Sequence, residues 1–258
     1  MPRYDFAAQR LFVEARIDPG ARITPSAEAL NYLMNVMRLR EGDRLLLFNG
    51  ADGEWLARLV DVSRRAASLL VETREREQDA PGDLDYVFAP LKQARLDYMV
   101  QKATEMGAGR LVPVITRRTQ VRRVNPARLR ANAIEAAEQC GILGVPAIAE
   151  AVELPVFLAT LPASRLLVFC DEDAPTHDPI AALRRAPAHD GASLLVGPEG
   201  GFDDAERALI LRHPNVARLS LGPRILRADT AAVAALALAQ AVLGDWAKAK
   251  GVRTRCRH

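Results

Sequence analysis

Cysteine and histidine are scarce in this chain of 258 residues, and neither follows a metal-binding pattern. The cysteines are odd in number and far apart, at Cys140, Cys170 and Cys256, and the four histidines are equally scattered. Zinc sites and disulfide frameworks need paired or regularly spaced ligands, so we expect no bound metal. Unpaired cysteines also suit a reducing compartment, and we expect the protein to be cytoplasmic.

Long apolar runs are lacking as well. The one extended run, from Ala231 to Leu243, is interrupted by Gln240 and is shorter than the ~20 residues that a membrane span needs. Charged residues are spread through positions 1–22, which argues against a secretory signal. We therefore expect no membrane partner.

The usual nucleotide-phosphate fingerprints are missing, although a glycine loop is present. The stretch "LLVGPEGGFDDAE" (194–206) has the pattern of a buried strand, a loop and an acidic helix. No lysine follows the glycines, the spacing is not GxGxxG, and Asp203, Asp204 and Glu206 occupy the positive end of the helix. Asp203 and Glu206 also have the spacing of a capping box. This loop favours a ligand with little net negative charge.

Positive charge gathers in one segment, although the formal net charge is only +3. Between Arg110 and Arg130 there is no acidic residue, and five further arginines lie there: Arg117, Arg118, Arg122, Arg123 and Arg128. Guanidinium groups match phosphate geometry, so this basic stretch favours contact with a nucleic-acid backbone. A solvated loop and helix face is the alternative interpretation.

The first part of the chain is predicted to be rich in β-structure. Strand-like runs at 44–48, 55–62 and 67–73 surround an Asn-Gly and Asp-Gly turn region. Ser26 precedes an amphipathic segment, 27–38, with apolar residues at helical spacing. The polar segment 75–83 then predicts a linker, which gives a first domain at 1–74 and a second at 84–258.

The second domain alternates between short apolar strands and helices, a pattern typical of a parallel sheet with both faces covered. We expect strands at 86–89, 111–115, 166–170, 193–196 and 217–221, and helices at 94–106, 126–140, 179–185, 203–212 and 230–248. Ligands of such α/β folds bind at the carboxyl ends of the strands.

Three strand ends carry unusual loops: "LLVFCDED", "LLVGPEGG" and "RLSLGPRILRADTA". If the three strands are neighbours, their loops can form one pocket of backbone donors and acceptors around an uncharged ring system such as adenosine. Each loop alone is compatible with an ordinary turn. The three together within sixty residues favour a binding site.

These residues resemble a known family. "LLVGPEGGFDDAE" and "LSLGPRILRADTAAVAAL" are similar to the two C-terminal motifs of the SPOUT methyltransferases, and closely to those of the RsmE-type small-subunit rRNA uridine N3-methyltransferases. "QRLFVEA", "MNVMRLREGDRLLLFNG", "LKQARLDYMVQKATEMGAGRLVPVITRRTQV" and "EAAEQCGILGVPAI" resemble the same family in the same order.

The resemblance implies an α/β fold: a C-terminal SPOUT-type knotted parallel-sheet domain, a small N-terminal PUA-like β-barrel that binds RNA, and a homodimer. It implies S-adenosyl-L-methionine as cofactor and small-subunit (16S) ribosomal RNA, or the assembled small ribosomal subunit, as partner. The implied cofactor contacts are Glu172, Gly197, Pro198, Glu199, Gly200, Gly201, Leu221, Gly222, Ile225, Leu226 and Ala231.

The implied reaction requires loss of the proton on uracil N3, and a fixed guanidinium would stabilise the negative charge that develops. Arg227 is our first choice for this role, with Arg224 and Arg10 as alternatives. The base stays open among Glu199, Glu138, Asp229 and solvent. A related methyltransferase acting on tRNA or a ribose hydroxyl, and a non-catalytic assembly factor, are the competing functions.

For RNA we expect contacts from the N-terminal domain and from the basic stretch, through Arg10, Arg38, Arg40, Arg117, Arg118, Arg122 and Arg123. Changing Arg117 and Arg118 to alanine should weaken RNA binding and leave cofactor affinity intact. Three positions depart from the family pattern, at Tyr32, Ile142 and Asp229. The departure at Ile142, where an arginine is usual, puts one RNA or substrate contact in doubt.

Overall fold

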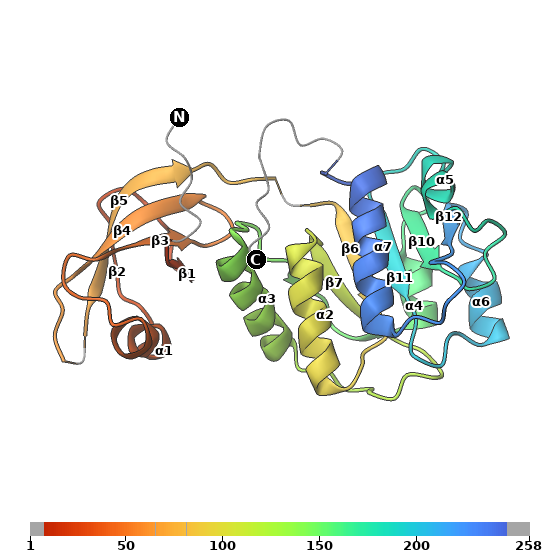
Figure 1. The fold of residues 1–258 in the computed structure, drawn as a ribbon, viewed down its shortest axis with the longest axis horizontal. Coiled ribbons are helices and arrows are strands. Elements are labelled where there is room, and N and C mark those ends of the chain that lie inside the picture. The colour runs from red at the N-terminus through yellow and green to blue at the C-terminus, as the bar shows by residue number, and fades with distance from the viewer. Residues whose placement is uncertain (1–7, 65, 81, 247–258) are drawn as a thin grey trace. The chain divides into compact units, whose positions relative to one another are not determined.

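The computed structural model describes residues 8–64, 66–80 and 82–246, and the chain folds as two compact units (Figure 1). The first unit comprises Met1–Pro81 and Ile134–Val145, and the second comprises Gly82–Ala133 and Pro146–His258. The division at 81/82 falls inside the expected linker, but the last strand of the first unit runs on to Arg76. The segment 134–145 joins the first unit from within the predicted second domain.

The first unit contains a curled five-stranded sheet in the order β1-β3-β4-β5-β2. Its strands are β1 (Arg10–Phe12), β2 (Arg22–Ile23), β3 (Arg44–Phe48), β4 (Glu54–Val60) and β5 (Ser68–Arg76). The β1–β3 pair is parallel and the other pairs are antiparallel. Two register shifts between β4 and β5 increase the local twist, as extra residues in a strand do. The inward side chains form an apolar core that includes Leu47, Leu59 and Leu69.

A helical segment packs on this core, but it is not the single α-helix that the periodicity of 27–38 predicts. Ser26 caps α1 (Ala27–Asn31) by accepting a hydrogen bond from the Ala29 N–H at 3.1 Å. The chain then continues as a π-helix, η1 (Tyr32–Val36). Leu33, within that turn, is 1% exposed and packs into the sheet, so tertiary packing accompanies the wider turn.

The second unit is built on a parallel sheet in the order β12-β10-β11-β6-β7-β8, and β9 also pairs with β7. All five expected strands are present as β6 (Leu84–Phe88), β7 (Arg110–Ile115), β10 (Leu166–Cys170), β11 (Ala192–Val196) and β12 (Val216–Leu219). The sequence did not predict the two-residue strands β8 (Ala147–Ile148) and β9 (Val152–Glu153). Such short pairs carry no periodic signal.

Helices cover both faces of this sheet, as expected. The helices of the second unit are α2 (Gln93–Glu105), α4 (Leu154–Thr160), α5 (Pro179–Arg184), α6 (Asp204–Ile210) and α7 (Ala228–Val242). Helix α3 (Pro126–Cys140) begins in this unit, and its residues 134–140 belong to the first. Helix α7 packs against α2 and α5, and α4 packs against α6 (Figure 1). Helix α4 was not predicted. The expected helix 230–248 is too long, because α7 ends at Val242 and residues 243–246 form turns; positions 247 and 248 lie outside the described residues.

Successive side chains along each strand point to opposite faces of the sheet. Val87, Phe169 and Leu195 pack with Phe157 and Ile210, which belong to α4 and α6. On the other face Tyr86 and Phe88 stack, with ring centroids 4.9 Å apart. Within residues 8–64, 66–80 and 82–246, no helix has both the length and the apolar character needed to cross a bilayer.

Candidate active site

The ends of β10, β11 and β12 lie side by side at one edge of the second sheet. Strand β10 pairs in parallel with both others, and its register matches Phe169 to Leu195 and Cys170 to Leu219. The loops that begin at Asp171, Gly197 and Ser220 therefore leave the sheet at the same edge. This meets the condition under which the sequence predicted a single pocket.

The glycine loop is a tight turn fixed by its own packing. A Cβ at Gly197 would lie 2.6 Å from the ring of Phe202, so any larger residue there would require the ring to move. The N–H of Gly201 donates to the Pro198 carbonyl at 2.9 Å, and Gly201 has a positive φ of 69°. The predicted capping box is present, with Asp203 and Glu206 each accepting the other's backbone N–H. The loop thus presents backbone groups from a preorganised position.

The acidic end of β10 is anchored by arginines from neighbouring elements. Asp171 is buried and accepts from Arg218 Nε at 2.6 Å and from Arg207 Nη2 at 3.2 Å. Glu172, the predicted ligand contact, is the next residue and is exposed. Just before them, burial raises the pKa of the Cys170 thiol to about 12. The charge of Asp171 is therefore paired within the protein, whereas Glu172 is exposed and stays a predicted ligand contact.

The loop between β12 and α7 is the most exposed part of this edge. Gly222 has a positive φ of 95°, and no atom lies within 4 Å of where its Cβ would stand. Ile225 is 100% exposed, which is unusual for an apolar residue. Arg227 is the N-cap residue of α7 and makes no side-chain capping bond. Leu221, Leu226 and Ala231 are only partly buried, so this loop is open to a ligand.

Two of the candidate bases, Glu199 and Asp229, lie close to Arg95, which the sequence did not predict to be part of the site. Arg95, on α2, pairs with Glu199, 104 positions away, and its Nε lies 4.0 Å from Asp229 Oδ2. For Arg227, by contrast, no carboxylate lies within 4 Å among residues 8–64, 66–80 and 82–246. Arg95 belongs to the motif "LKQARLDYMV", but the motif alone does not tell which side chain faces the glycine loop.

Two arginines of the basic stretch contact the glycine loop and the start of the helix that follows it. The Arg117 N–H donates to Glu206 Oε1 at 2.7 Å, and its guanidinium pairs with Asp203 at 2.8 Å. Arg118 Nη1 donates to the Gly200 carbonyl at 2.6 Å. These contacts support the glycine loop, so removing both arginines is not expected to leave the loop unchanged. The proposed double substitution is therefore no clean test of RNA binding.

The remaining basic residues differ in their partners. Arg122 pairs with Glu153 at 3.1 Å, with both side chains more than half exposed. Arg123 is exposed, and so are Arg38 and Arg40 in the first unit. Surface pairs of this kind contribute only ~0–1 kcal/mol, so such arginines stay available to phosphates.

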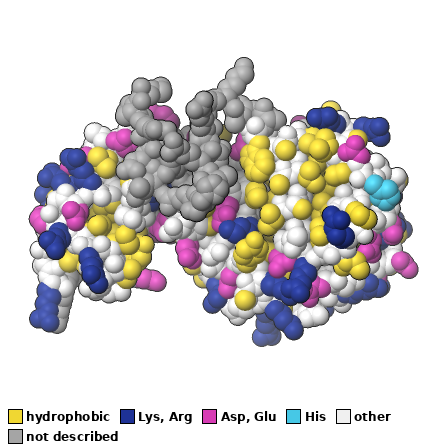
Figure 2. Space-filling model, in the orientation of Figure 1, with side chains coloured by type: hydrophobic (Ala, Val, Ile, Leu, Met, Phe, Trp, Pro, Cys, Tyr) yellow, Lys and Arg dark blue, Asp and Glu magenta, His cyan; other side chains and the backbone are white. Residues whose placement is uncertain are grey.

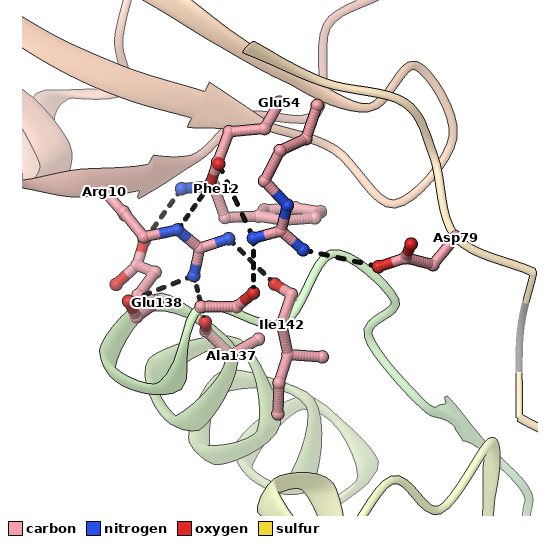
Figure 3. A network of polar contacts seen from close by, with 9 residues as sticks. Arg10, Phe12, Glu54, Asp79, Ala137, Glu138 and Ile142 are labelled. Atoms are coloured by element: carbon pink, nitrogen blue, oxygen red, sulfur yellow. Dashed lines mark hydrogen bonds and ion pairs between the residues drawn. The ribbon is translucent and has the colours of Figure 1, made fainter. Parts of the chain in front are cut away.

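Arg10 is placed differently from the RNA contact that the sequence predicted (Figure 3). Its side chain is 5% exposed and pairs at 2.6 Å with Glu54, which is fully buried. The guanidinium also donates to backbone carbonyls at the end of α3, those of Ala137, Glu138 and Ile142. With its donors used inside the first unit, Arg10 is unsuited to bind RNA or to stabilise a uracil anion.

Glu138 and Ile142 belong to the same region of the first unit. The Glu138 carboxylate accepts the Phe12 N–H at 2.8 Å, and burial raises its pKa (Figure 3). Ile142 packs beside a small core formed with Phe48. Glu138 is thus held by the backbone of β1, and an apolar residue suits position 142.

Within the described residues, His, Cys, Asp and Glu side chains form no group of three or more that could hold a metal ion. The donors at the sheet edge are mainly backbone groups, with open space at Gly201 and Gly222. Such a set suits an uncharged ring system better than a cation or a polyphosphate.

Two family models match the chain in a way that agrees with this architecture. An RNA methyltransferase domain matches residues 78–240, and an RNA methyltransferase PUA domain matches residues 25–72. The chain belongs to this RNA methyltransferase family. The PUA match covers the helical segment, β3, β4 and the first part of β5 in the first unit, and the methyltransferase match covers the sheet with the glycine loop.

Individual relatives extend the match over most of the chain. A ribosomal RNA small subunit methyltransferase E from Rickettsia conorii is 32% identical over 229 residues, which cover 88% of this chain and 93% of that protein. The protein of the same name from Bacillus subtilis is 28% identical and covers 88% of this chain.

Solved structures show the same fold. A methyltransferase from Legionella pneumophila, in complex with bound SAM, has a TM-score of 0.80 at 30% identity, covering 92% of this chain and 99% of its own. A ribosomal RNA small subunit methyltransferase E from Neisseria gonorrhoeae, bound to S-adenosyl methionine, has a TM-score of 0.83 at 25% identity, covering 93% and 99%. The expected α/β fold, with a parallel-sheet methyltransferase domain and an N-terminal PUA domain, is confirmed, and the SPOUT-type knot stays a prediction.

Proposed function

We propose that this chain transfers a methyl group from S-adenosyl-L-methionine to N3 of a uridine in small-subunit (16S) ribosomal RNA. The observation that carries the proposal is the meeting of three strand ends, β10, β11 and β12, beside the cluster of Arg95, Glu199 and Asp229. The Rickettsia and Bacillus relatives are named as methyltransferases of that RNA, and two solved relatives hold the cofactor.

The residues at the sheet edge fit this cofactor. The loops 197–201 and 221–226 offer backbone donors and acceptors, no atom lies within 4 Å of a Cβ built at Gly201 or at Gly222, and exposed Glu172 offers a carboxylate for a hydroxyl or a charged amine. Exposed Ile225 would lose its contact with water when a ring packs against it. When bound, the cofactor supplies the electrophilic methyl group on its sulfonium sulfur.

The protein must remove the N3 proton and stabilise the charge that spreads to the flanking carbonyl oxygens. Arg227 suits the second task because it is exposed and its guanidinium has no carboxylate partner in the part of the chain that the structure describes. Glu199, Asp229 and solvent remain the candidates for the base. Glu138 is not among them, since it binds the Phe12 N–H in the first unit.

A uridine within folded RNA must leave its stack to reach this edge, which costs a few kcal/mol. Binding elsewhere has to offset that cost. Exposed arginines of the PUA unit, Arg38 and Arg40, and of the basic stretch, Arg122 and Arg123, serve this role. The partner is ribosomal RNA or the assembled small subunit, which places the enzyme in the cytoplasm.

The enzyme acts as a homodimer through the outer face of α7. Figure 2 shows apolar side chains gathered over α7 and its neighbours. Tyr98 of α2 and Ile180 of α5 are 45% and 41% exposed, and both helices pack against α7. A contiguous apolar surface of this kind is typical of a protein interface. Sedimentation at micromolar concentration should give twice the mass of 28.2 kDa.

The test is methylation in vitro followed by nucleoside analysis. Purified protein, labelled S-adenosylmethionine and unmodified 16S rRNA or small subunits should give 3-methyluridine at a single position, and Arg227→Ala should reduce the rate without loss of cofactor binding. A 2′-O-methylated nucleoside would show the ribose reaction instead. Cofactor binding without methylation of either RNA form would favour an assembly factor.

A further inference from the structure

A separate pocket lies beside the glycine loop, on the side of β6 and β7. It has a volume of about 190 Å³ and is lined by residues from the loops that follow β6, β7 and β11 and by Arg95 of α2. The cofactor edge is formed by β10, β11 and β12, so only the β11 loop is common to both. The pocket is smaller than the ~300–1,000 Å³ of sites that enclose drug-sized ligands. It suits one small group of a larger ligand.

Positive charge dominates its walls. Lys92, Arg95 and Arg118 face it, whereas Glu199 is its single carboxylate. Arg95 is paired with that carboxylate, and Arg118 donates to the Gly200 carbonyl. These two cations are therefore already used in holding the loops together.

Lys92 remains available to a ligand. It is exposed, and within residues 8–64, 66–80 and 82–246 no carboxylate lies within 4 Å of its ammonium group. It is the N-cap residue of α2, a helix of 13 residues that has no acidic residue in its first turn and no side-chain cap. The positive end of this helix adds to the charge of Lys92.

The position of the pocket indicates which anion it meets. Glu199 belongs both to the pocket and to the candidate active site, so a nucleotide that reaches Glu199 brings its own backbone phosphates to this wall. An ammonium group on a flexible stem binds phosphate as a point charge. The cofactor has no phosphate, and of its predicted contacts only Pro198, Glu199 and Gly200 line this pocket.

We infer that this pocket binds a phosphodiester group of the substrate RNA that flanks the target nucleotide, with Lys92 as its principal contact. The inference rests on the proposed function, because it assumes that RNA enters beside Glu199. Lys92 is thus a positioning residue: it orients the nucleotide through its phosphate and does not touch the reacting base.

The first measurement is the salt dependence of RNA binding by Lys92→Gln and by a charge-matched control, Arg212→Gln. Arg212 is an exposed cation between α6 and the amino end of β12. The pocket lies instead at the carboxyl ends of β6, β7 and β11. Lys92→Gln should bind RNA roughly three- to tenfold more weakly, and the slope of log K against log [salt] should fall by about 0.7 to 1. Arg212→Gln should behave as wild type, and Lys92→Arg should restore binding.

The second measurement identifies the phosphate. A short RNA containing the target uridine is made with one neutral methylphosphonate linkage on its 5′ or 3′ side, and binding is measured with wild type and Lys92→Gln. In a double-mutant cycle, one of the two linkages should weaken wild-type binding and have little further effect on the variant. Affinity for S-adenosylmethionine should be the same in all proteins.

The outcomes separate the two proposals. If wild type methylates no RNA, the proposed function fails, and the salt dependence still tests the pocket with any RNA that the protein binds. If Lys92→Gln matches Arg212→Gln in affinity and slope, or if both linkages add their full effect to the variant, the inference is wrong. If Lys92→Gln weakens cofactor binding as much as RNA binding, the pocket belongs to the cofactor.

Discussion

Substitution of Arg10 tests whether this residue binds RNA or stabilises the first unit. Its guanidinium contacts Glu54 and three carbonyls at the end of α3, and it lies 4.3 Å from the ring of Phe48. Arg10→Met keeps much of the apolar stem but removes the charge and all these donors. Glu54, with 0% exposure, then keeps its contact with Arg76, whose Nη1 lies 3.6 Å from Glu54 Oε2.

The expected loss follows from the burial of both partners. Removing one member of a buried ion pair costs ~3–5 kcal/mol, because the other charge stays desolvated. The remaining contact with Arg76 places the loss near the lower end of this range, and the abandoned carbonyls add to it. At ~2–4 °C per kcal/mol for a chain of this size class, a loss of ~3 kcal/mol should lower the midpoint of thermal unfolding by ~6 to 12 °C.

The assay is thermal or urea unfolding followed by circular dichroism and by tryptophan fluorescence, since Trp55 belongs to the core of the first unit. Arg16→Met is the matched control, because the Arg16–Asp18 pair is 80% and 53% exposed and should contribute less than ~1 kcal/mol. Arg10→Met combined with Glu54→Leu should recover part of the loss, since no unpaired charge remains. If Arg10→Met unfolds like wild type but loses RNA affinity, the burial argument is wrong.

Three further outcomes are expected. Arg118→Ala should lower affinity for S-adenosylmethionine roughly three- to tenfold in calorimetry by releasing the glycine loop, and an unchanged affinity would contradict this. The hydrogen bond from Arg128 lowers the pKa of Asp97, so this pair stabilises the fold at pH values above the ordinary pKa of 3.8. Its contribution is lost as the pH falls through the lowered pKa. Asp97→Asn should therefore reduce the difference in stability between pH 6 and pH 3. Burial raises the pKa of Cys170 to about 12, so alkylation at pH 8 followed by peptide mass spectrometry should modify exposed Cys140 and spare Cys170 until the protein unfolds.

The sequence was sufficient wherever a structure depends on nearby residues. The strands 44–48 and 166–170 and the helix 126–140 have the predicted bounds, because an apolar run or a helical period identifies them locally. The capping box of Asp203 and Glu206 joins residues three apart and was predicted for that reason. The π-helical turn at 32–36 was not predicted, because it accompanies the packing of Leu33 against residues of the sheet that are distant in the sequence.

The site shows the same division. Its motifs at 194–206 and 219–236 predict which loops face a ligand, and they resemble those of the family to which the chain belongs. Which charges meet on those loops depends on the strand order, which places β6 beside β11 and so brings Arg95 to Glu199. The same chain path buries Arg10 against the end of α3 and leaves Lys92 open at a pocket. Local sequence thus determined the elements and the chemistry of the loops, whereas only the tertiary fold decided the partner of each arginine, because ion pairs between distant residues depend on how strands and helices assemble.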